Sequence, residues 1–240
     1  MLKQYILNQR ANYSKQHRQK NHYWFLSAVT SESYRILSSL IQRYVSGSVL
    51  DAGCGYGAWK TILLAKAQHY TSLDGRQDSG ADHIGDLQNM PVFKDQSFDV
   101  VFCAQVFEYL TSPQQALLEF SRVLKPHGLV IISAPFLAPL HDEPYDLFRY
   151  SVDGLRHLLV QNNFEVLESQ KVGGLFCLIT HPASIVILGL FGNILILGSI
   201  ARFLNRILII YPAIMLDRFF SLHQYFFSNA VIVARKKADN

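Results

Sequence analysis

The pattern of apolar positions along this 240-residue chain changes near residue 46, and this change divides the sequence. Over residues 12–45 they recur every third or fourth position, which predicts one amphipathic helix, and the run Ser46-Gly47-Ser48 ends it. Beyond this break, short apolar runs alternate with stretches of helical period. We expect strands at 49–50, 70–73, near 84, 98–104, 129–133, 164–167 and 229–234, helices at 58–67, 114–124 and 152–161, and a turn at 126–128. This alternation predicts an α/β fold with a mostly parallel, seven-stranded sheet and helices on both faces.

The last two expected strands are separated by about sixty mostly apolar residues, which is long for a connection. Residues 172–201 contain no Asp, Glu, Lys or Arg, and 183–200 is long enough to be a transmembrane candidate. We therefore divide the chain into four parts: an N-terminal helical lid segment (1–46), a core (47–171), an apolar helical insertion (172–228), and a final core strand with a basic tail (229–240).

Charge and cysteine content narrow the partners and the compartment. Only 17% of the residues are charged and the net charge is +4, yet the first acidic residue, Glu32, follows five lysines and arginines. A basic leading segment in a chain with an apolar insertion favours a lipid headgroup surface, and no nucleic-acid reading module accompanies it. The three cysteines are widely spaced without a CxxC pair, which predicts no metal or disulfide framework and a reducing compartment. The amino terminus has no apolar segment typical of a secretory signal.

A glycine-rich turn follows the first expected strand. Glycines 53, 55 and 57 let the backbone turn sharply and approach a ligand, and the following helix presents free N–H groups to it. Asp74, at the end of the second expected strand, is placed to accept hydrogen bonds from a ribose diol. This pair of features fits either a nicotinamide cofactor or S-adenosylmethionine. Asp51 favours the second, because an anion there opposes a pyrophosphate but attracts an ammonium group.

Five blocks in order also closely resemble the type 11 form of the class I S-adenosylmethionine-dependent methyltransferases. They are residues 49–57 (VLDAGCGYG), the acid Asp74, residues 85–93, residues 97–101 and residues 122–128. The resemblance implies a Rossmann-like methyltransferase fold with S-adenosylmethionine as cofactor. It also implies that Gly53, Gly55 and Gly57 bind the methionine portion of the cofactor, with Asp51 and Cys54 in the same turn. The implied partner of the ribose is Asp74. The implied partners of the adenine are Asp86 and Leu87.

Two acidic positions carry a structural alternative. Asp86 could instead cap the N-terminus of a helix. Asp99 we interpret as structural, capping the turn before its strand. The N-terminal aromatics 22–25 are similar to a lid helix of the family, although such spacing is more often found in a core.

The acceptor side of the site is less clearly marked. Many relatives carry Glu-His after the fourth strand, where this chain has Glu108-Tyr109, so a histidine base is missing there. Residues 141–150 follow the fifth expected strand, at the edge where α/β sheets bind substrates. The segment resembles a block in family members associated with surface-polysaccharide assembly. We predict catalytic roles for His141 (as base), Tyr109 and Tyr150, and acceptor binding by Arg149 and Tyr145. The structural alternative is an ordered loop in which Arg149 pairs with Asp146 and Tyr150 packs inward.

Topology limits how the insertion can meet a membrane. Since 229–234 must rejoin the sheet, the insertion makes an even number of crossings, dips in and returns, or lies in the interface. Pro212 and the shortness of 207–216 disfavour a second span. We favour a monotopic hairpin held at the headgroups by three cations, Arg202, Arg206 and Arg218. The alternative is a soluble apolar lid or a homodimer interface.

These observations favour a methyltransferase at the cytoplasmic membrane face that acts on an amphiphilic acceptor such as a lipid-linked sugar, an isoprenoid or a related lipid. One alternative is a methyltransferase of a soluble metabolite, with the hairpin as dimer interface. Another is a catalytically silent cofactor-binding scaffold, and a nicotinamide oxidoreductase is the most distant.

Overall fold

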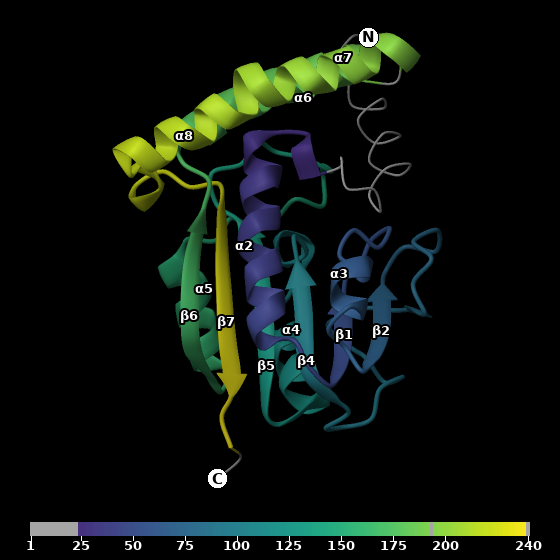
Figure 1. The fold of residues 1–240 in the computed structure, drawn as a ribbon. Coiled ribbons are helices and arrows are strands. Elements are labelled where there is room, and N and C mark those ends of the chain that lie inside the picture. Colours follow the sequence, from purple (N-terminus) through teal and green to yellow (C-terminus); the bar gives the residue numbers. More distant parts are fainter. Residues whose placement is uncertain (1–23, 193, 239–240) are drawn as a thin grey trace. The chain divides into compact units, whose positions relative to one another are not determined.

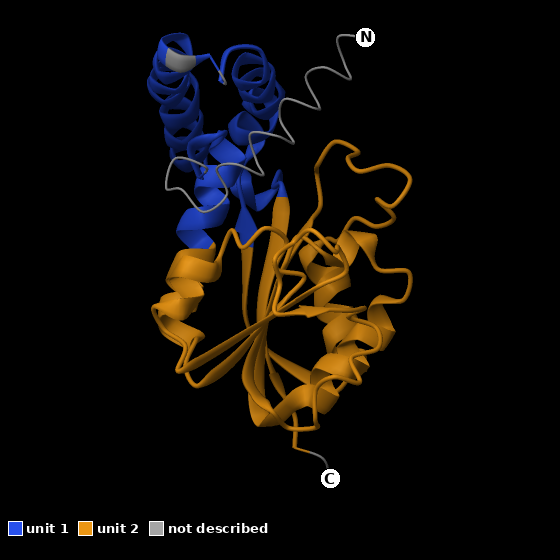
Figure 2. Ribbon diagram, turned by 90° about the vertical axis from the view of Figure 1, so that its right-hand side faces the viewer, with its two compact units in different colours: residues 1–36, 171–228 blue, residues 37–170, 229–240 orange. Residues whose placement is uncertain are grey.

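The computed structural model describes residues 24–192 and 194–238. The chain forms two compact units, which are described separately (Figure 2). Unit 1 comprises residues 1–36 and 171–228, and unit 2 comprises residues 37–170 and 229–240. The helical insertion therefore belongs to one unit, and nearly all of the sheet belongs to the other.

Unit 2 is built on a seven-stranded sheet in the order β3-β2-β1-β4-β5-β7-β6 (Figure 1). The neighbours β1–β2, β2–β3, β1–β4 and β4–β5 are parallel, whereas β5 and β7 are antiparallel. The strands are β1 (Ser48–Ala52), β2 (His69–Asp74), β3 (His83–Ile84), β4 (Phe98–Ala104), β5 (Leu124–Pro135), β6 (Phe164–Val172) and β7 (Asn229–Lys236). This topology confirms the mostly parallel seven-stranded sheet.

Helices cover both faces of this sheet, which Figure 2 shows edge-on. They are α2 (Ala28–Tyr44), which enters unit 2 at residue 37, α3 (Lys60–Leu64), the short 3₁₀ helix η2 (Phe107–Tyr109), α4 (Pro113–Val123) and α5 (Val152–Gln161). The strands read as apolar runs because both faces are covered. Phe102 of β4, Phe120 of α4 and Phe164 of β6 are fully buried.

Two helices begin later than their periodicity predicts. α2 begins at Ala28, because the Ser27 side chain accepts a hydrogen bond from the Thr30 N–H (3.2 Å) and caps it. The part of the expected helix before residue 24 lies outside the described residues. α3 begins only at Lys60, after three glycines with positive φ, a conformation that no helix contains.

Strand β5 is longer than expected. The predicted turn at 126–128 is instead part of the strand, which starts at Leu124 and shifts its register against β4 between Phe98 and Val100. His127 takes the positive φ of +62° that this irregularity requires. The turn prediction was therefore wrong: the residues form a bulge within the strand.

Unit 1 contains a helical hairpin. Helix α6 (Leu175–Phe191) packs along a second helical arm made of α7 (Leu195–Asn205), the π-helical segment η3 (Arg206–Ile210) and α8 (Tyr211–Phe220), and the 3₁₀ turn η4 (Leu222–Gln224) follows. The buried carboxylate of Asp217 in α8 accepts hydrogen bonds from the N–H groups of Phe176 (2.9 Å) and Cys177 (2.8 Å), so it caps the start of α6.

The second arm is longer than the expected segment 207–216, whose shortness, together with Pro212, disfavoured a second span. Pro212 lies in the first turn of α8, directly after the π-helical turn. A proline needs no donor partner there, so the helix continues. The 25-residue helix Ile196–Phe220 is long and apolar enough to cross a membrane by length and composition alone, and this is weak evidence for such a span.

Candidate active site

The glycine turn lies at the carboxyl end of β1. Gly53, Gly55 and Gly57 have φ values of +77°, +57° and +74°, a region that favours glycine over every other residue. A Cβ on Gly53 would also lie 2.4 Å from the Val106 side chain, which packs against the turn. The turn is fixed to the neighbouring strand because the Gly53 N–H donates to the Leu73 carbonyl (2.7 Å).

Asp74 lies beside this turn at the end of β2. Its carboxylate accepts hydrogen bonds from the Gly55 N–H (2.7 Å) and from the backbone N–H (2.9 Å) and Nε (3.1 Å) of Arg76. The Arg76 side chain is 49% exposed and lies over the ring of Tyr56, with Cζ 4.9 Å from its centroid. An incoming ribose would compete with Arg76 for the same carboxylate, a contact that sequence reasoning missed.

Asp51 lies under the turn and is almost completely buried. Its carboxylate accepts a hydrogen bond from the Tyr70 hydroxyl (2.8 Å), and burial raises its pKa to about 7. Cys54 is half-buried in the same turn, and burial raises the pKa of its thiol to about 12. That thiol is therefore not activated as a nucleophile.

Asp86 and Leu87 follow β3. The exposed Asp86 carboxylate accepts hydrogen bonds from the N–H (2.9 Å) and the side-chain amide (3.1 Å) of Gln88, while Leu87 is buried. No helix begins here, so the alternative of a helix cap is wrong, and the carboxylate instead closes a turn. Asp99 is structural, as interpreted. Its partners are the Ser48 N–H (2.8 Å) and Lys125 rather than the turn before its strand.

These residues suit S-adenosylmethionine. The glycine turn exposes backbone at the end of β1, and carboxylates at the ends of β2 and β3 can accept hydrogen bonds from hydroxyl and amino groups. The buried acid Asp51 lies where a pyrophosphate would be repelled. All of these groups belong to unit 2, so the cofactor side of the site is contained in one unit.

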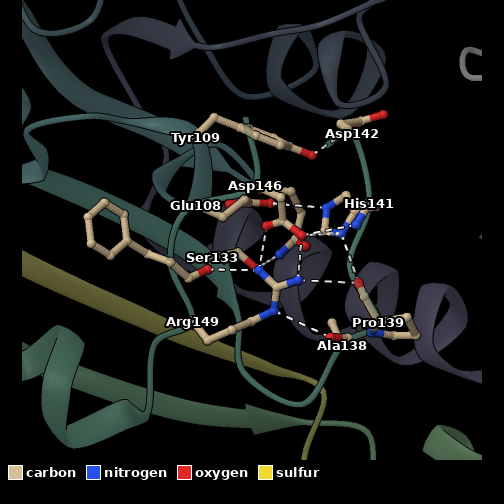
Figure 3. A network of polar contacts seen from close by, with 11 residues as sticks. Glu108, Tyr109, Ser133, Ala138, Pro139, His141, Asp142, Asp146 and Arg149 are labelled. Carbon is tan, nitrogen blue, oxygen red and sulfur yellow. Dashed lines mark hydrogen bonds and ion pairs between the residues drawn. The ribbon is translucent and has the colours of Figure 1, made fainter. Parts of the chain in front are cut away.

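The segment after β5 forms a polar network (Figure 3). Both oxygens of Asp146 accept hydrogen bonds from Arg149. The remaining donors of Arg149 bind the carbonyls of Ala138 (3.4 Å), Pro139 (3.2 Å) and Phe148 (2.9 Å). Every N–H direction of the guanidinium is thus used inside the loop. This favours the structural alternative for Arg149 over anion binding.

His141 lies in the same network. Its Nδ1 is 3.1 Å from the Pro139 carbonyl and 3.4 Å from Asp146, and its Nε2 is 3.9 Å from Glu108. The imidazole edge packs against the Tyr109 ring, with centroids 5.8 Å apart. The neighbouring Glu108 raises the pKa of His141. Because a carbonyl can only accept, Nδ1 donates to Pro139 and a neutral imidazole carries its lone pair on Nε2.

Glu108 was not among the predicted site residues. Its side chain is completely buried in η2, and among the described residues neither carboxylate oxygen has a hydrogen-bond partner. Burial raises its pKa. The pair Glu108-Tyr109 was the sequence signal, but it was interpreted only as the absence of a histidine base. The structure brings His141 from the loop after β5 to the side of Glu108.

The three tyrosines differ in placement. The Tyr109 hydroxyl donates to Asp142 (3.0 Å), and burial raises its pKa above the usual range. The buried Tyr150 donates to the Phe107 carbonyl (3.2 Å), which favours inward packing over catalysis. Tyr145 is 70% exposed and remains available to an acceptor. Among the described residues, no three His, Cys, Asp or Glu side chains form a group that could hold a metal ion.

The fold and the cofactor side of the site together define a Rossmann-like protein of the S-adenosylmethionine-binding class. Comparison with known proteins gives the family: residues 50–132 match the model described as "Methyltransferase domain". Residues 50–132 are thus a methyltransferase domain of the class I S-adenosylmethionine-dependent type, and S-adenosylmethionine is the cofactor of this class.

Curated relatives agree with this assignment. The chain is 31% identical over 120 residues to a malonyl-[acyl-carrier protein] O-methyltransferase of Serratia marcescens, which covers 46% of each chain. It is 29% identical over 170 residues to a "probable S-adenosylmethionine-dependent methyltransferase" of Mycolicibacterium smegmatis (64% of this chain, 63% of the other). The chain spans about half the length of the first of these relatives.

Solved structures show the same fold. The [4+2]-cyclase SpnF has a TM-score of 0.61 at 19% identity, covering 88% of this chain and 83% of its own. An S-adenosylmethionine-dependent methyltransferase from Archaeoglobus fulgidus has a TM-score of 0.55 at 15% identity (85% and 97%). At these identities the likeness establishes the fold alone.

Proposed function

We propose that this protein transfers a methyl group from S-adenosylmethionine to an oxygen of an amphiphilic acceptor at the cytoplasmic face of a membrane. Oxygen is favoured because relatives such as the Serratia marcescens protein and a ubiquinone biosynthesis protein of Rickettsia conorii are named as O-methyltransferases. Lipid-linked sugars, including surface-polysaccharide precursors, isoprenoids and related lipids are the acceptor classes that combine such a hydroxyl with an apolar part.

The observation that carries the amphiphilic acceptor is the apolar surface of the hairpin. The second arm and the residues after it expose large apolar side chains to an unusual degree. Ile196 (78%), Phe203 (61%), Leu208 (66%), Met215 (70%), Phe219 (81%) and Tyr225 (76%) are the most exposed of them. Such a surface is costly in water, and it suits the boundary between headgroups and acyl chains.

Cations on the same arm support an interfacial position. Arg202 bonds to the Gly192 carbonyl (2.8 Å), Arg206 lies over the Phe25 ring (3.7 Å from its centroid), and the half-exposed Arg218 pairs with Glu32 (3.0 Å). Their long stems can lie along apolar surface while the charged heads reach phosphate groups. We infer a monotopic attachment, since the chain must return from the hairpin to β7.

For methyl transfer, the protein has to align the acceptor oxygen with the methyl group and remove the proton of the acceptor. S-adenosylmethionine supplies an electrophilic methyl group whose transfer leaves a neutral thioether. Gly53, Gly55 and Gly57 would hold its methionine portion, Asp74 its ribose, and Asp86 with Leu87 its adenine. His141 would take the acceptor proton on Nε2, and the exposed Tyr145 would contact the acceptor.

Incubating the full-length protein with methyl-labelled S-adenosylmethionine and membranes tests this function. We expect label in the lipid extract. Replacing Ile196, Phe203, Met215 and Phe219 by Ser should reduce membrane binding and lipid methylation at least about 10-fold, because exposed apolar area is lost, and should leave cofactor affinity unchanged. The matched control replaces four exposed apolar residues of unit 2, Leu64, Val92, Leu118 and Val160, and should change neither.

The alternatives predict other outcomes. A soluble metabolite methyltransferase would leave the lipid extract unlabelled, and the hairpin variant would turn a dimer into a monomer in light scattering. A silent scaffold would bind the cofactor without labelling any fraction. The fold alone does not require methyl transfer, since a protein of this fold is named a [4+2]-cyclase.

A further inference from the structure

The strongest feature that the proposed function leaves unused is the buried carboxylate of Glu108. Its side chain has no exposed area, and neither oxygen is hydrogen-bonded within the described part of the chain. An ionisable group in this state destabilises the fold, so its presence calls for a reason other than stability. The carboxylate lies against a candidate catalytic group, His141 (Figure 3).

The other carboxylates near His141 are either paired with a cation or exposed to solvent. Asp146 lies 3.4 Å from Nδ1, but both of its oxygens are bound by Arg149, which lowers the pKa of Asp146 to about 2 and balances its charge. Asp142 is bound by the Tyr109 hydroxyl at the exposed side of the loop. The uncompensated carboxylate that faces the imidazole is therefore Glu108.

Ionisable groups of β4, η2 and the segment after β5 surround Glu108. Cys103 of β4 and Tyr150 sense its charge, and burial raises the pKa of both. Tyr109 adjoins it in η2, and Asp146 and His141 reach it from the loop after β5. Arg149 also interacts with this charge, but its guanidinium is bound by Asp146 and by three carbonyls of the loop. His141 is therefore the titratable group beside Glu108 that can gain a positive charge to balance it.

The distance defines what the pair can do. At 3.9 Å, Nε2 and the Glu108 carboxylate are too far apart for a hydrogen bond, so the Nε2 lone pair is left for a proton from elsewhere. They are close enough for a strong interaction between charges in a site with little solvent. Nδ1 is meanwhile fixed by its bond to the Pro139 carbonyl.

We propose that Glu108 is the positioning residue of the acceptor site: its buried carboxylate holds the His141 imidazole in place and balances the charge that His141 gains when it removes the acceptor proton. This rests on the proposed function. In the step, the acceptor O–H bond breaks and its proton goes to Nε2. The oxygen electron pair forms the new O–CH₃ bond, and the electrons of the broken C–S bond stay on sulfur. His141, from the loop after β5, thus takes the place of the histidine that is missing after Glu108.

Titration of His141 by NMR tests the pair without any acceptor. The His141 signal is assigned from its loss in His141→Gln. We expect the wild-type midpoint to lie above 6.5 and to fall by about one unit or more in Glu108→Gln, since the neutral amide cannot stabilise the imidazolium. Glu143→Gln, which removes an exposed carboxylate of the same loop, is the matched control and should leave the midpoint within about 0.3 units.

A second variant guards against misfolding. Glu108→Leu removes the buried charge without adding a polar group, so the folded protein should become more heat-stable while the His141 midpoint falls as in Glu108→Gln. For methyl transfer, both variants should lower kcat about 10-fold or more and shift its pH profile toward acid, with a smaller effect on KM.

The outcomes separate the two proposals. An unchanged His141 midpoint in both Glu108 variants overturns the Glu108–His141 pair, whatever happens to activity. A midpoint that falls while kcat and its pH profile stay constant overturns the positioning role of Glu108 in catalysis. Absence of methyl transfer by the wild type, with the midpoint shift intact, contradicts the proposed function and leaves the electrostatic pair established.

Discussion

Two acidic side chains lie near the carboxyl ends of neighbouring strands with almost no exposure to solvent. Asp51 of β1 is 2% exposed and Glu108, just after β4, is completely buried. Burial raises the pKa of each, because water no longer stabilises the charged form. Burying such an acid destabilises the folded protein. Buried acids at the edge where α/β sheets bind substrates are typical of functional sites.

Replacing Asp51 by Asn tests whether the burial of this acid lowers the free energy of unfolding. The pKa of Asp51 is raised from 3.8 to about 7, so the folded protein holds a proton that the unfolded chain releases, and stability falls as the pH rises through this window. Asp51→Asn does not titrate. The advantage of the variant in free energy of unfolding should therefore grow between pH 4 and 7, by up to about 4 kcal/mol, in urea titrations without cofactor. A constant difference across this range would show that Asp51 is not buried as described.

The candidate base can be tested by a single substitution. His141→Ala should lower kcat by about two to four orders of magnitude, because proton removal from a hydroxyl acceptor becomes unassisted. Affinity for S-adenosylhomocysteine should stay the same, since the residues that we propose to bind the cofactor lie at the ends of β1, β2 and β3. In the wild type, kcat should rise with pH to a midpoint above 6.5, because the raised pKa keeps His141 protonated at lower pH. An unaffected kcat in the variant would point to an acceptor that needs no base.

The cofactor side of the site could be predicted from the sequence more completely than the acceptor side. The cofactor side follows from backbone rules: a strand, glycines with positive φ, and an acid at the next strand end are all local patterns. The acceptor side depends on contacts between distant segments, such as Glu108 with His141. No periodicity reports whether Arg149 binds a ligand or, as here, uses all its donors inside its own loop.

Among elements, the strands and the helices that cover the sheet were predicted closely, because each strand is an apolar run and the helices keep a period of 3.6. The predicted bounds of 98–104 and 152–161 equal those of β4 and α5. The differences arise where tertiary contacts override local preference. The glycine turn delays α3, and pairing with β4 draws the expected turn at 126–128 into β5.

A buried polar contact joins α8 to the start of α6 in the hairpin. Asp217→Ala should leave the N–H groups of Phe176 and Cys177 without an acceptor and destabilise the start of α6 by about 1–2 kcal/mol. Hydrogen exchange of these two amides should accelerate accordingly, while amides of β4 remain unchanged. Gly174→Ala should act the same way, since its Cβ would lie 2.4 Å from the Asp217 side chain. Unchanged exchange in both variants would exclude this contact as the clasp of the hairpin.

At the scale of the whole molecule, the two units carry different parts of the proposed function. Every residue that we propose to bind the cofactor belongs to unit 2, whereas the exposed apolar arm belongs to unit 1. Replacing residues 175–226 by a short Gly/Ser loop should therefore give a protein that still binds S-adenosylhomocysteine but is no longer membrane-bound and no longer methylates lipid. The readouts are calorimetry and fractionation. Loss of cofactor binding in a folded deletion variant would show that the units do not separate these tasks.

The most direct test of the account is calorimetry of the full-length protein with S-adenosylhomocysteine and with NAD. We predict micromolar affinity for the first and no binding of the second. Asp74→Ala should weaken the first by about 1.5–3 kcal/mol, because hydrogen bonds from the ribose to a carboxylate are lost. Binding of NAD, or equal affinity of wild type and Asp74→Ala for S-adenosylhomocysteine, would contradict the assignment of this site.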